Sequence, residues 1–306
     1  TRYGTVTGVQ TCALPIFNED RFWQRHKCML IHGGGMAARG TRRILRRMHE
    51  ERERIYPSDP ATLVERWTPA RELPEAICFG EFDVELARIP HGASADPRLM
   101  EGLPTHFALP ALLPFPAGIR VLLKIDEKSR AEADRFLQLV MLHLLMAVPP
   151  GKIRFLIFDP VGLGRSFAAF MHLADHDEQL VSARIWTEAS AVEQRLADLT
   201  EHMETVIQKY LRNEYASIEA YNEQAGEIAE PYRILVMADF PTNVSDQAAK
   251  RFASILQSGA RCGVHVLLLR DLRAALPPGL DASDLRRGTM TIAWNERASG
   301  WRIEEG

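Results

Sequence analysis

The chain contains 306 residues, of which 46% are hydrophobic and 25% are charged, and its formal net charge is -3. This composition is normal for a globular protein with a sizeable core, and it excludes a chain that captures polyanions through its overall charge. The charge is uneven, however, because arginines crowd one short N-terminal stretch.

Cysteine spacing and hydropathy indicate the compartment. The four cysteines form no C-x-x-C pair, so they predict neither a disulfide framework nor a zinc site. They are Cys12, Cys28, Cys78 and Cys262. The longest apolar helix candidate, Phe136–Val148, is shorter than the roughly 20 residues that span a bilayer. With no secretory signal either, we expect a cytoplasmic protein without a membrane segment.

The N-terminal third is predicted to lack a regular fold of its own. Within residues 1–16, Val6–Ile16 reads VTGVQTCALPI and resembles a translated sequencing adapter, so we set it aside and expect a fragment of a longer protein. Residues 17–56 are predicted to form an arginine-rich helical arm, with a Gly33–Gly35 hinge and a helix from Thr41. Residues 57–105 read as a proline-rich irregular linker, with short strands at best around Ala76–Val84.

The arginines of the arm admit three interpretations. They can form a solvated helix face that pairs with neighbouring glutamates, they can contact the phosphates of DNA, or they can belong to a coiled-coil arm. The candidates for DNA contact are Arg42, Arg43, Arg46 and Arg47.

Residues 106–306 alternate strand and helix patterns, which predicts right-handed βαβ units in a three-layer α/β fold with a parallel sheet. The predicted strands are Ile119–Ile125, Ile153–Asp159, Arg184–Trp186, Ile234–Asp239, Val264–Leu269 and Met290–Trp294. The predicted helices are Arg130 to about Val148, opened by a capping box at Ser129 and Glu132, then Ala191–Arg212, and Asp246–Ser258 between Ser245 and the terminator Gly259.

Two of these strands end in aspartate. The sequences IRFLIFD, ending at Asp159, and ILVMAD, ending at Asp239, are continuous apolar runs, as expected of strands buried on both faces. Ligands of parallel sheets bind at the carboxyl ends of strands, and P-loop ATPases hold magnesium with such an acid. No G-x-x-x-x-G-K-[ST] phosphate loop occurs anywhere in the chain.

The order of these motifs resembles the motor domain of the FtsK/SpoIIIE family of P-loop ATPases. The resemblance covers about Leu112–Arg270 and includes Phe158-Asp159-Pro160, the helix followed by Tyr221-Asn222, and Ile234–Asp239 as the Walker B strand. It is closest to bacterial proteins of this family whose first ATPase-like module is altered. The resemblance implies a RecA-like P-loop fold, ATP and magnesium as ligands, DNA as a partner, other ATPase modules of the same protein, and a homo-oligomeric ring.

The sequence departs from the family at the phosphate loop. Asp126-Glu127-Lys128-Ser129 stands there, without glycine and with two carboxylates that would repel a triphosphate. Lys128 and Ser129 still echo the end of a phosphate loop and are candidate nucleotide ligands. The alternative is that Ser129 caps the helix and Lys128 is a surface charge.

Further departures concern the catalytic groups. Asp239 is the candidate magnesium ligand, but Phe240 follows it where the family has a glutamate that polarises water. Val161 replaces the basic residue that follows Asp159-Pro160 in the family. Arg261 is either an arginine finger for a neighbouring subunit or a surface residue.

Three functions remain open on the sequence. The chain can be a degenerate ATPase module that contributes ring assembly or regulation to a translocase. It can be an active DNA or protein translocase with an unusual phosphate site, or a non-catalytic scaffold that binds protein partners. The missing phosphate loop and the missing Walker B glutamate favour the first.

Overall fold

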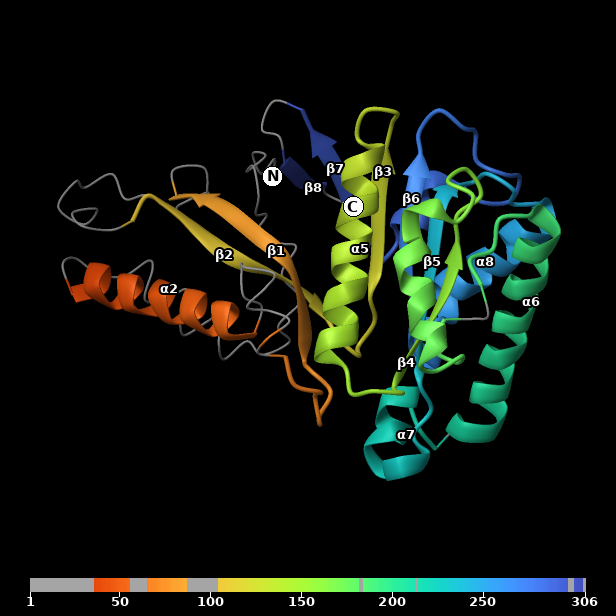
Figure 1. The fold of residues 1–306 in the computed structure, drawn as a ribbon, viewed down its shortest axis with the longest axis horizontal. Helices are drawn as coiled ribbons and strands as arrows, with labels where there is room; N and C mark the ends of the chain where they lie inside the picture. The colour runs from red at the N-terminus through yellow and green to blue at the C-terminus, as the bar shows by residue number, and fades with distance from the viewer. Residues whose placement is uncertain are drawn as a thin grey trace. The chain divides into compact units, whose positions relative to one another are not determined.

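A computed structural model describes residues 36–55, 65, 67–86, 104–181, 184–212, 214–296 and 300–304. The predictions for residues 1–16 and for Gly33–Gly35 lie outside these ranges. The chain divides into two compact units, and the larger one runs from Phe115 to Gly300 together with Pro69–Glu75. Figure 1 shows the elements of both units.

The smaller unit contains the helix α2 (Met36–Ile55) and the strands β1 (Ala76–Glu85) and β2 (His106–Pro114). The two strands pair in antiparallel register from Ala76 opposite Pro114 to Glu85 opposite His106. This pairing differs from the predicted boundary at residue 106, because β2 joins the supposed linker segment instead of the large sheet. The α/β unit therefore begins at Phe115.

The arginine-rich segment is helical, as predicted, and α2 begins five residues before Thr41. The four candidate arginines for DNA contact are exposed, namely Arg42, Arg43, Arg46 and Arg47. Arg46 forms an ion pair with Glu50 one turn later, at 3.7 Å. This pair is what a solvated helix face would show.

The large sheet has six strands in the order β4-β5-β6-β3-β7-β8. Their bounds are β3 (Arg120–Ile125), β4 (Ile153–Phe158), β5 (Tyr232–Phe240), β6 (Val264–Asp271), β7 (Met290–Asn295) and β8 (Gly300–Glu304). The pairs β4–β5, β5–β6, β6–β3 and β3–β7 are parallel. The predicted fold class is confirmed, while β8 was missed because the sequence GWRIE has no apolar run.

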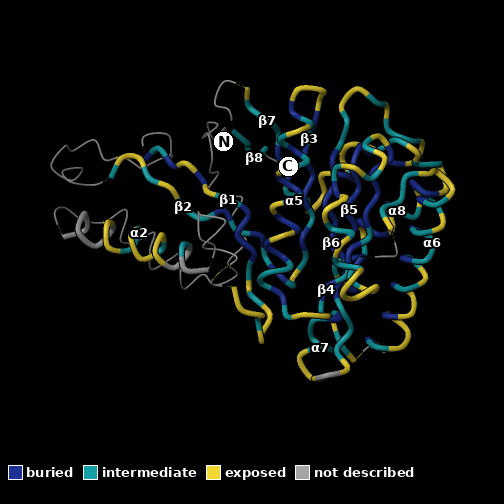
Figure 2. The backbone as a smooth tube through the Cα atoms, viewed as in Figure 1, coloured by how far each residue is buried: buried dark blue, intermediate teal, exposed yellow. Residues whose placement is uncertain are grey.

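Helices cover both faces of this sheet. The connection through α5 (Arg130–Ala147) leads from β3 across to β4, whereas those through α6 (Ala189–Thr205) and α8 (Asp246–Ser258) run in the opposite direction. Because such crossovers are right-handed, α5 lies on one face and α6 with α8 on the other. The central strands are buried between these layers (Figure 2).

The helix ends follow the sequence only in part. Ser245 caps α8 as predicted, because its hydroxyl accepts from the Ala248 N–H at 3.1 Å. Gly259 keeps a right-handed backbone, so it is not the left-handed terminator that was predicted. That conformation falls on Gly263, with φ of 74°, just before β6. The long helix changes at Thr205 into a π-helical turn, Val206–Leu211.

Two predicted features are smaller or simpler than expected. The segment around Arg184–Trp186 contributes one parallel bridge, between Trp186 and Phe158, beside the edge strand β4. Cys78 and Cys262 are buried free thiols. Across the described segments, the helices are too short or too polar for any of them to pass through a membrane.

A buried histidine joins β6 to the residue before β3. His265 is fully buried, and its Nδ1 accepts a hydrogen bond from the Ile119 N–H at 2.8 Å. Burial lowers the pKa of His265 to about 3. An ordinary histidine pKa is about 6.5, so the unfolded chain takes up a proton between these values that the folded chain refuses.

We therefore expect the free energy of unfolding to fall as the pH is lowered from about 6.5 toward 4. His265→Gln, which keeps a side-chain acceptor for Ile119 but cannot be protonated, should flatten this dependence. Urea unfolding at a series of pH values measures it. A parent and a variant with the same pH slope would contradict this role of His265.

Candidate functional site

The two aspartates predicted from the sequence lie at the carboxyl edge of neighbouring parallel strands. Asp159 follows β4, and Asp239 is the penultimate residue of β5. Both side chains are fully buried, and the charge of Asp239 contributes to the electrostatics of Asp159. The prediction that they share one sheet edge is confirmed.

Asp239 is held by an arginine that the sequence did not single out. Arg130, the first residue of α5, donates from Nη2 to Oδ2 of Asp239 at 2.6 Å, and its Nη1 makes an ion pair with Oδ1. The Arg130 side chain is 22% exposed and Asp239 is 0% exposed. A two-pronged pair of this kind is among the strongest side-chain contacts and engages both carboxylate oxygens.

The backbone at Asp239 is unusual. Its φ is 57°, a left-handed value that non-glycine residues seldom adopt. The pairing of β5 with β6 shifts between Met237 and Phe240, so Asp239 sits in a bulge at the strand end. Bulges re-aim side chains at strand ends next to functional sites. Here the bulge accompanies a carboxylate that meets Arg130.

Asp159 is enclosed by its own loop. Its Oδ1 accepts from the Gly162 N–H at 2.9 Å, and its Oδ2 accepts from the Ser166 N–H at 3.2 Å. A Cβ atom on Gly162 would lie 2.4 Å from either carboxylate oxygen, so the loop needs glycine there. Burial raises the pKa of Asp159 above its ordinary value, against the hydrogen bonds that favour the charged form.

A third carboxylate, Asp134, lies one turn after Arg130 on α5. Its Oδ2 accepts from the Ser166 hydroxyl at 3.0 Å, while its Oδ1 is buried without a hydrogen-bond partner among the described residues. Burial raises the pKa of Asp134, and the charges of Asp159 and Asp239 raise it further. Three coupled carboxylates thus face one guanidinium.

The loop at the place of the phosphate loop is closed on itself. The Asp126 carboxylate accepts from the N–H groups of Lys128 and Ser129 at 3.1 and 2.9 Å, and from the Ser129 hydroxyl at 2.7 Å. The Ser129 hydrogen bonds are the largest cause of the lowered pKa of Asp126. A carboxylate of the chain therefore uses the backbone donors that a bound phosphate would need.

The predicted capping box is wrong. Ser129 stands at the N-cap of α5, but it has helical backbone angles and its side chain makes no cap hydrogen bond. Its hydroxyl instead exchanges hydrogen bonds with Asp126, accepting from the Asp126 N–H at 3.0 Å. Glu132, the other member of the box, pairs with Arg135 at 2.6 Å. The upstream carboxylate outcompetes the local motif because it is the stronger acceptor.

The outer side of the same loop carries two exposed ion pairs. Lys128 Nζ lies 3.1 Å from Glu296 at the end of β7, and Glu127 lies 3.4 Å from Arg273 after β6. The Lys128 side chain is 76% exposed. The structure thus directs this candidate phosphate ligand to the surface, away from Asp239 and Asp159.

The remaining candidates lie apart from the carboxylates. Phe240, in the position of the family's glutamate, is buried with its ring 5.2 Å from that of Phe252. Arg261 precedes β6, at the opposite edge of the sheet, and donates to the Ala216 carbonyl at 2.8 Å. The arm arginines belong to the smaller unit.

Magnesium and a triphosphate do not fit the residues in this arrangement. Arg130 engages both oxygens of the candidate magnesium ligand, and Asp126 engages the loop N–H groups. In the ranges that the structure describes, no group of three or more His, Cys, Asp or Glu side chains is positioned to hold a metal ion. The sequence signal that was overlooked is Arg130 with Asp134 at i and i+4, a spacing that puts both side chains on one helix face.

The N-terminal segment and the α/β unit match different known proteins. The Toprim-domain family of topoisomerase 6 (its A-type chain) and Spo11 matches residues 12–54. The A-type chain of type 2 DNA topoisomerase 6 from Methanocaldococcus jannaschii is 47% identical over 36 residues, which is 12% of this chain and 10% of that protein. These matches cover too little of the chain to assign a family.

Solved structures similar to this chain include secretion and conjugation proteins. EssC (ATPases 2 and 3) from Geobacillus thermodenitrificans has 15% identity and a TM-score of 0.48, covering 74% of this chain and 38% of that one. The type VII secretion ATPase EccC of Thermomonospora curvata has 19% identity and a TM-score of 0.44, covering 77% and 25%. The pCW3 conjugation coupling protein TcpA has 12% and 0.46, covering 80% and 70%.

These structures agree with the FtsK/SpoIIIE resemblance predicted from the sequence, as a likeness of fold alone. The chain spans about two fifths of EssC and a quarter of EccC. At such low identities and TM-scores, nothing about activity follows from them.

Proposed function

We propose that the α/β unit is an FtsK/SpoIIIE-like ATPase module of a larger translocase, and that it serves ring assembly or regulation without hydrolysing ATP. The observation that carries this proposal is the contact of Arg130 with both oxygens of Asp239, the candidate magnesium ligand.

The Arg130 contact opposes magnesium binding for two reasons. A magnesium ion at Asp239 would have to break a buried two-pronged ion pair. It would also bring its own charge close to the guanidinium, which like-charge repulsion disfavours in a site shielded from water. Arg130 thus supplies the positive charge that the ion supplies in an active module.

The loop Asp126–Ser129 opposes the triphosphate in the same way. Phosphate loops bind through free backbone N–H groups, and here those of Lys128 and Ser129 already donate to Asp126. The triphosphate would have to displace a carboxylate of its own charge sign. Phe240 adds a third obstacle, because it cannot act as the general base that helps hydrolysis by about 10²–10⁴-fold.

We expect the full chain to hydrolyse magnesium-ATP no faster than buffer alone. Phe240→Glu, which restores the family's glutamate, should also remain inactive, because the phosphate and magnesium positions stay closed. Release of ADP measured over hours, with a folded-state check by circular dichroism, tests this. Magnesium-dependent turnover by the parent chain would overturn the proposal and favour an active translocase.

The arm supports a second candidate function, contact with DNA. Arg42, Arg43 and Arg47 are exposed, and Arg46 has only a loose ion pair on the surface. The matching of residues 12–54 to a domain of DNA topoisomerases supports this proposal. The contact would be with phosphates and independent of base sequence.

We expect the full chain to bind duplex DNA with an affinity that falls steeply with salt. Replacing Arg42, Arg43, Arg46 and Arg47 by glutamine should reduce the slope of log K against log[salt] by about one for each phosphate that is no longer bound. Fluorescence anisotropy at several salt concentrations measures the slope. An unchanged slope would leave protein partners as the role of the arm.

A further inference from the structure

Two arginines lie side by side at the amino edge of the large sheet, opposite to the carboxylate site. Arg154 of β4 and Arg233 of β5 are register partners in the parallel pair, so their side chains leave the same face of the sheet. That face is the one covered by α6, because Arg233 Nη2 lies 3.3 Å from His202 Nδ1 on this helix. Like charges on neighbouring strands destabilise a sheet unless an opposite charge joins them.

The described residues supply too little negative charge for this pair. Arg154 donates to the neutral side chain of Gln179. Arg233 Nη2 lies 3.3 Å from Glu230, longer than the roughly 2.7–2.9 Å usual for a charged pair. The Nε of Arg233 is buried without a hydrogen-bond partner among the described residues. Two guanidiniums therefore share one loosely held carboxylate.

His202 adds another free donor to this cluster. Burial, helped by the charges of Arg233 and Arg154, lowers the pKa of His202 to about 4, so the ring is neutral at pH 7. Because Nδ1 faces an Arg233 donor, the proton belongs on Nε2, which has no hydrogen-bond partner in the described chain. The side chains of His202, Arg233 and Glu230 are 15%, 26% and 16% exposed, so solvent reaches the cluster.

The π-helical turn Val206–Leu211 lies directly after α6 and next to this cluster. It carries Tyr210, which is close enough to Arg233 to influence its pKa. The Tyr210 ring lies 5.2 Å from that of Tyr221 in α7 (Ile218–Ala225). Short π-helical turns occur frequently at functional sites, because the extra residue redirects side chains.

We propose that Arg154, Arg233 and His202 form a binding site for an oxyanion of the phosphate class, either free phosphate or the phosphate of a mononucleotide. The anion accepts hydrogen bonds from the unpartnered Arg233 and His202 donors and takes the place of the Glu230 carboxylate. This inference does not depend on the proposed function, because the carboxylate site lies at the other edge of the sheet.

Calorimetric titration of the full chain with inorganic phosphate, and separately with AMP, tests the proposal. We expect saturable binding that Arg154→Gln and Arg233→Gln each weaken about tenfold, through loss of a charge-assisted hydrogen bond. Glu230→Gln should tighten binding, since it removes the competing carboxylate. Tighter binding of AMP than of phosphate would identify a nucleotide as the source of the anion, and equal binding would identify free phosphate.

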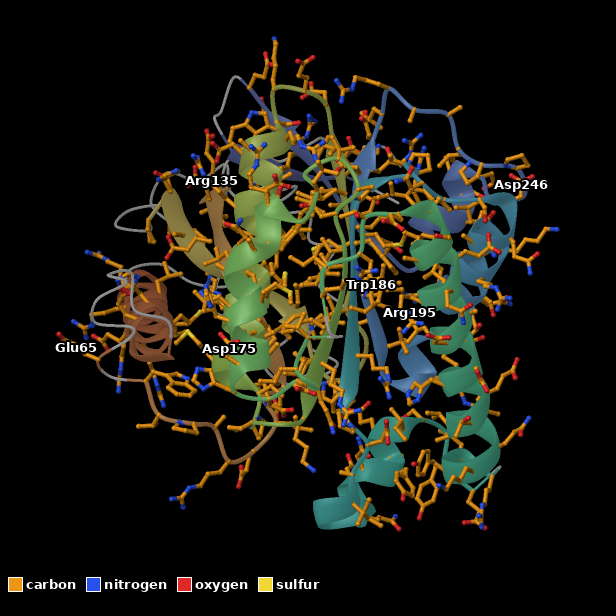
Figure 3. All side chains as sticks on the ribbon, turned by 45° about the vertical axis from the view of Figure 1, so that its right-hand side comes forward. Glu65, Arg135, Asp175, Trp186, Arg195 and Asp246 are labelled. Atoms are coloured by element: carbon orange, nitrogen blue, oxygen red, sulfur yellow. The ribbon has the colours of Figure 1, made fainter. Side chains whose placement is uncertain are left out.

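The matched control is Arg195→Gln. Arg195 lies on the same helix two turns before His202, where its guanidinium carbon is 5.0 Å from the centre of the Trp186 ring (Figure 3). This variant removes the same charge and should leave phosphate binding unchanged. The proposal is overturned if neither ligand binds saturably, if Arg195→Gln weakens binding as much as Arg154→Gln does, or if Glu230→Gln weakens it. Should Arg233→Gln fail to fold, the Arg154 and Glu230 variants still decide.

Discussion

Arg130→Met is expected to destabilise the chain by about 3 kcal/mol, because removing one partner leaves a buried charge uncompensated. Methionine keeps the aliphatic stem of Arg130 but removes the cation that faces Asp239, and with it the positive charge nearest to Asp134 and Asp159. Urea unfolding at pH 7 measures the change.

Arg135→Met is the control for this prediction. Arg135 lies on the same helix, its side chain is 70% exposed, and it pairs with Glu132 at the surface (Figure 3). Its loss should cost less than about 1 kcal/mol. Adding Asp239→Asn to Arg130→Met should recover part of the lost stability, because the orphan charge is removed as well. Equal effects of the two arginine variants would show that Arg130 is an ordinary surface residue.

The Arg130→Met variant should also respond to pH in a defined direction. The pKa of Asp134 and that of Asp159 are already raised by burial in the parent chain. A carboxyl group with a raised folded pKa contributes stability below its unfolded pKa and loses it as the pH rises through the folded value. Without Arg130 both pKa values rise further, so the deficit relative to the parent should shrink between pH 7 and about 5.

Gly162→Ala is expected to destabilise the chain by about 1–3 kcal/mol, the usual cost of overpacking. The added Cβ would lie 2.4 Å from both carboxylate oxygens of Asp159, which is closer than any real contact. The Asp159 side chain is fully buried and held by two N–H groups, so it has nowhere to move. Thermal unfolding monitored by circular dichroism measures the loss.

Two comparisons show whether the cause is this contact. Val161→Ala changes the neighbouring residue, whose side chain is 54% exposed, and should have an effect within about 0.5 kcal/mol. In an Asp159→Ala background, Gly162→Ala should cost little, because the clashing oxygens are gone. Additive effects of the two substitutions would contradict the enclosed-carboxylate geometry.

The sheet could be predicted from the sequence because its strands are continuous apolar runs. Five of the six strands and the helices α5, α6 and α8 lie where periodicity and punctuation put them. The hairpin of β1 and β2 was missed as a unit, since strand pairing depends on residues that are distant in sequence. The 3-10 segment Arg165–Asp175 and α7 carry too weak a periodicity to be noticed.

The candidate site was predictable only in its two aspartates. Their position follows from the rule that strand ends of a parallel sheet share one edge. Arg130 was missed because its partner Asp239 is 109 residues away, and such a distance leaves no local pattern. The Ser129 capping box failed for the opposite reason, since a local motif lost its hydroxyl to the nearby Asp126 carboxylate.

The most direct test of a closed nucleotide site is isothermal titration of the full chain with ATP at millimolar concentration, with and without magnesium. The closed loop at Asp126 and the contact of Arg130 with Asp239 predict no magnesium-dependent binding. If a mononucleotide site at Arg154 and Arg233 gives heat, that heat should be independent of magnesium and absent in Arg154→Gln. Magnesium-dependent binding that survives Arg154→Gln would contradict a closed site, because it would require Arg130 and Asp126 to yield their places to the nucleotide.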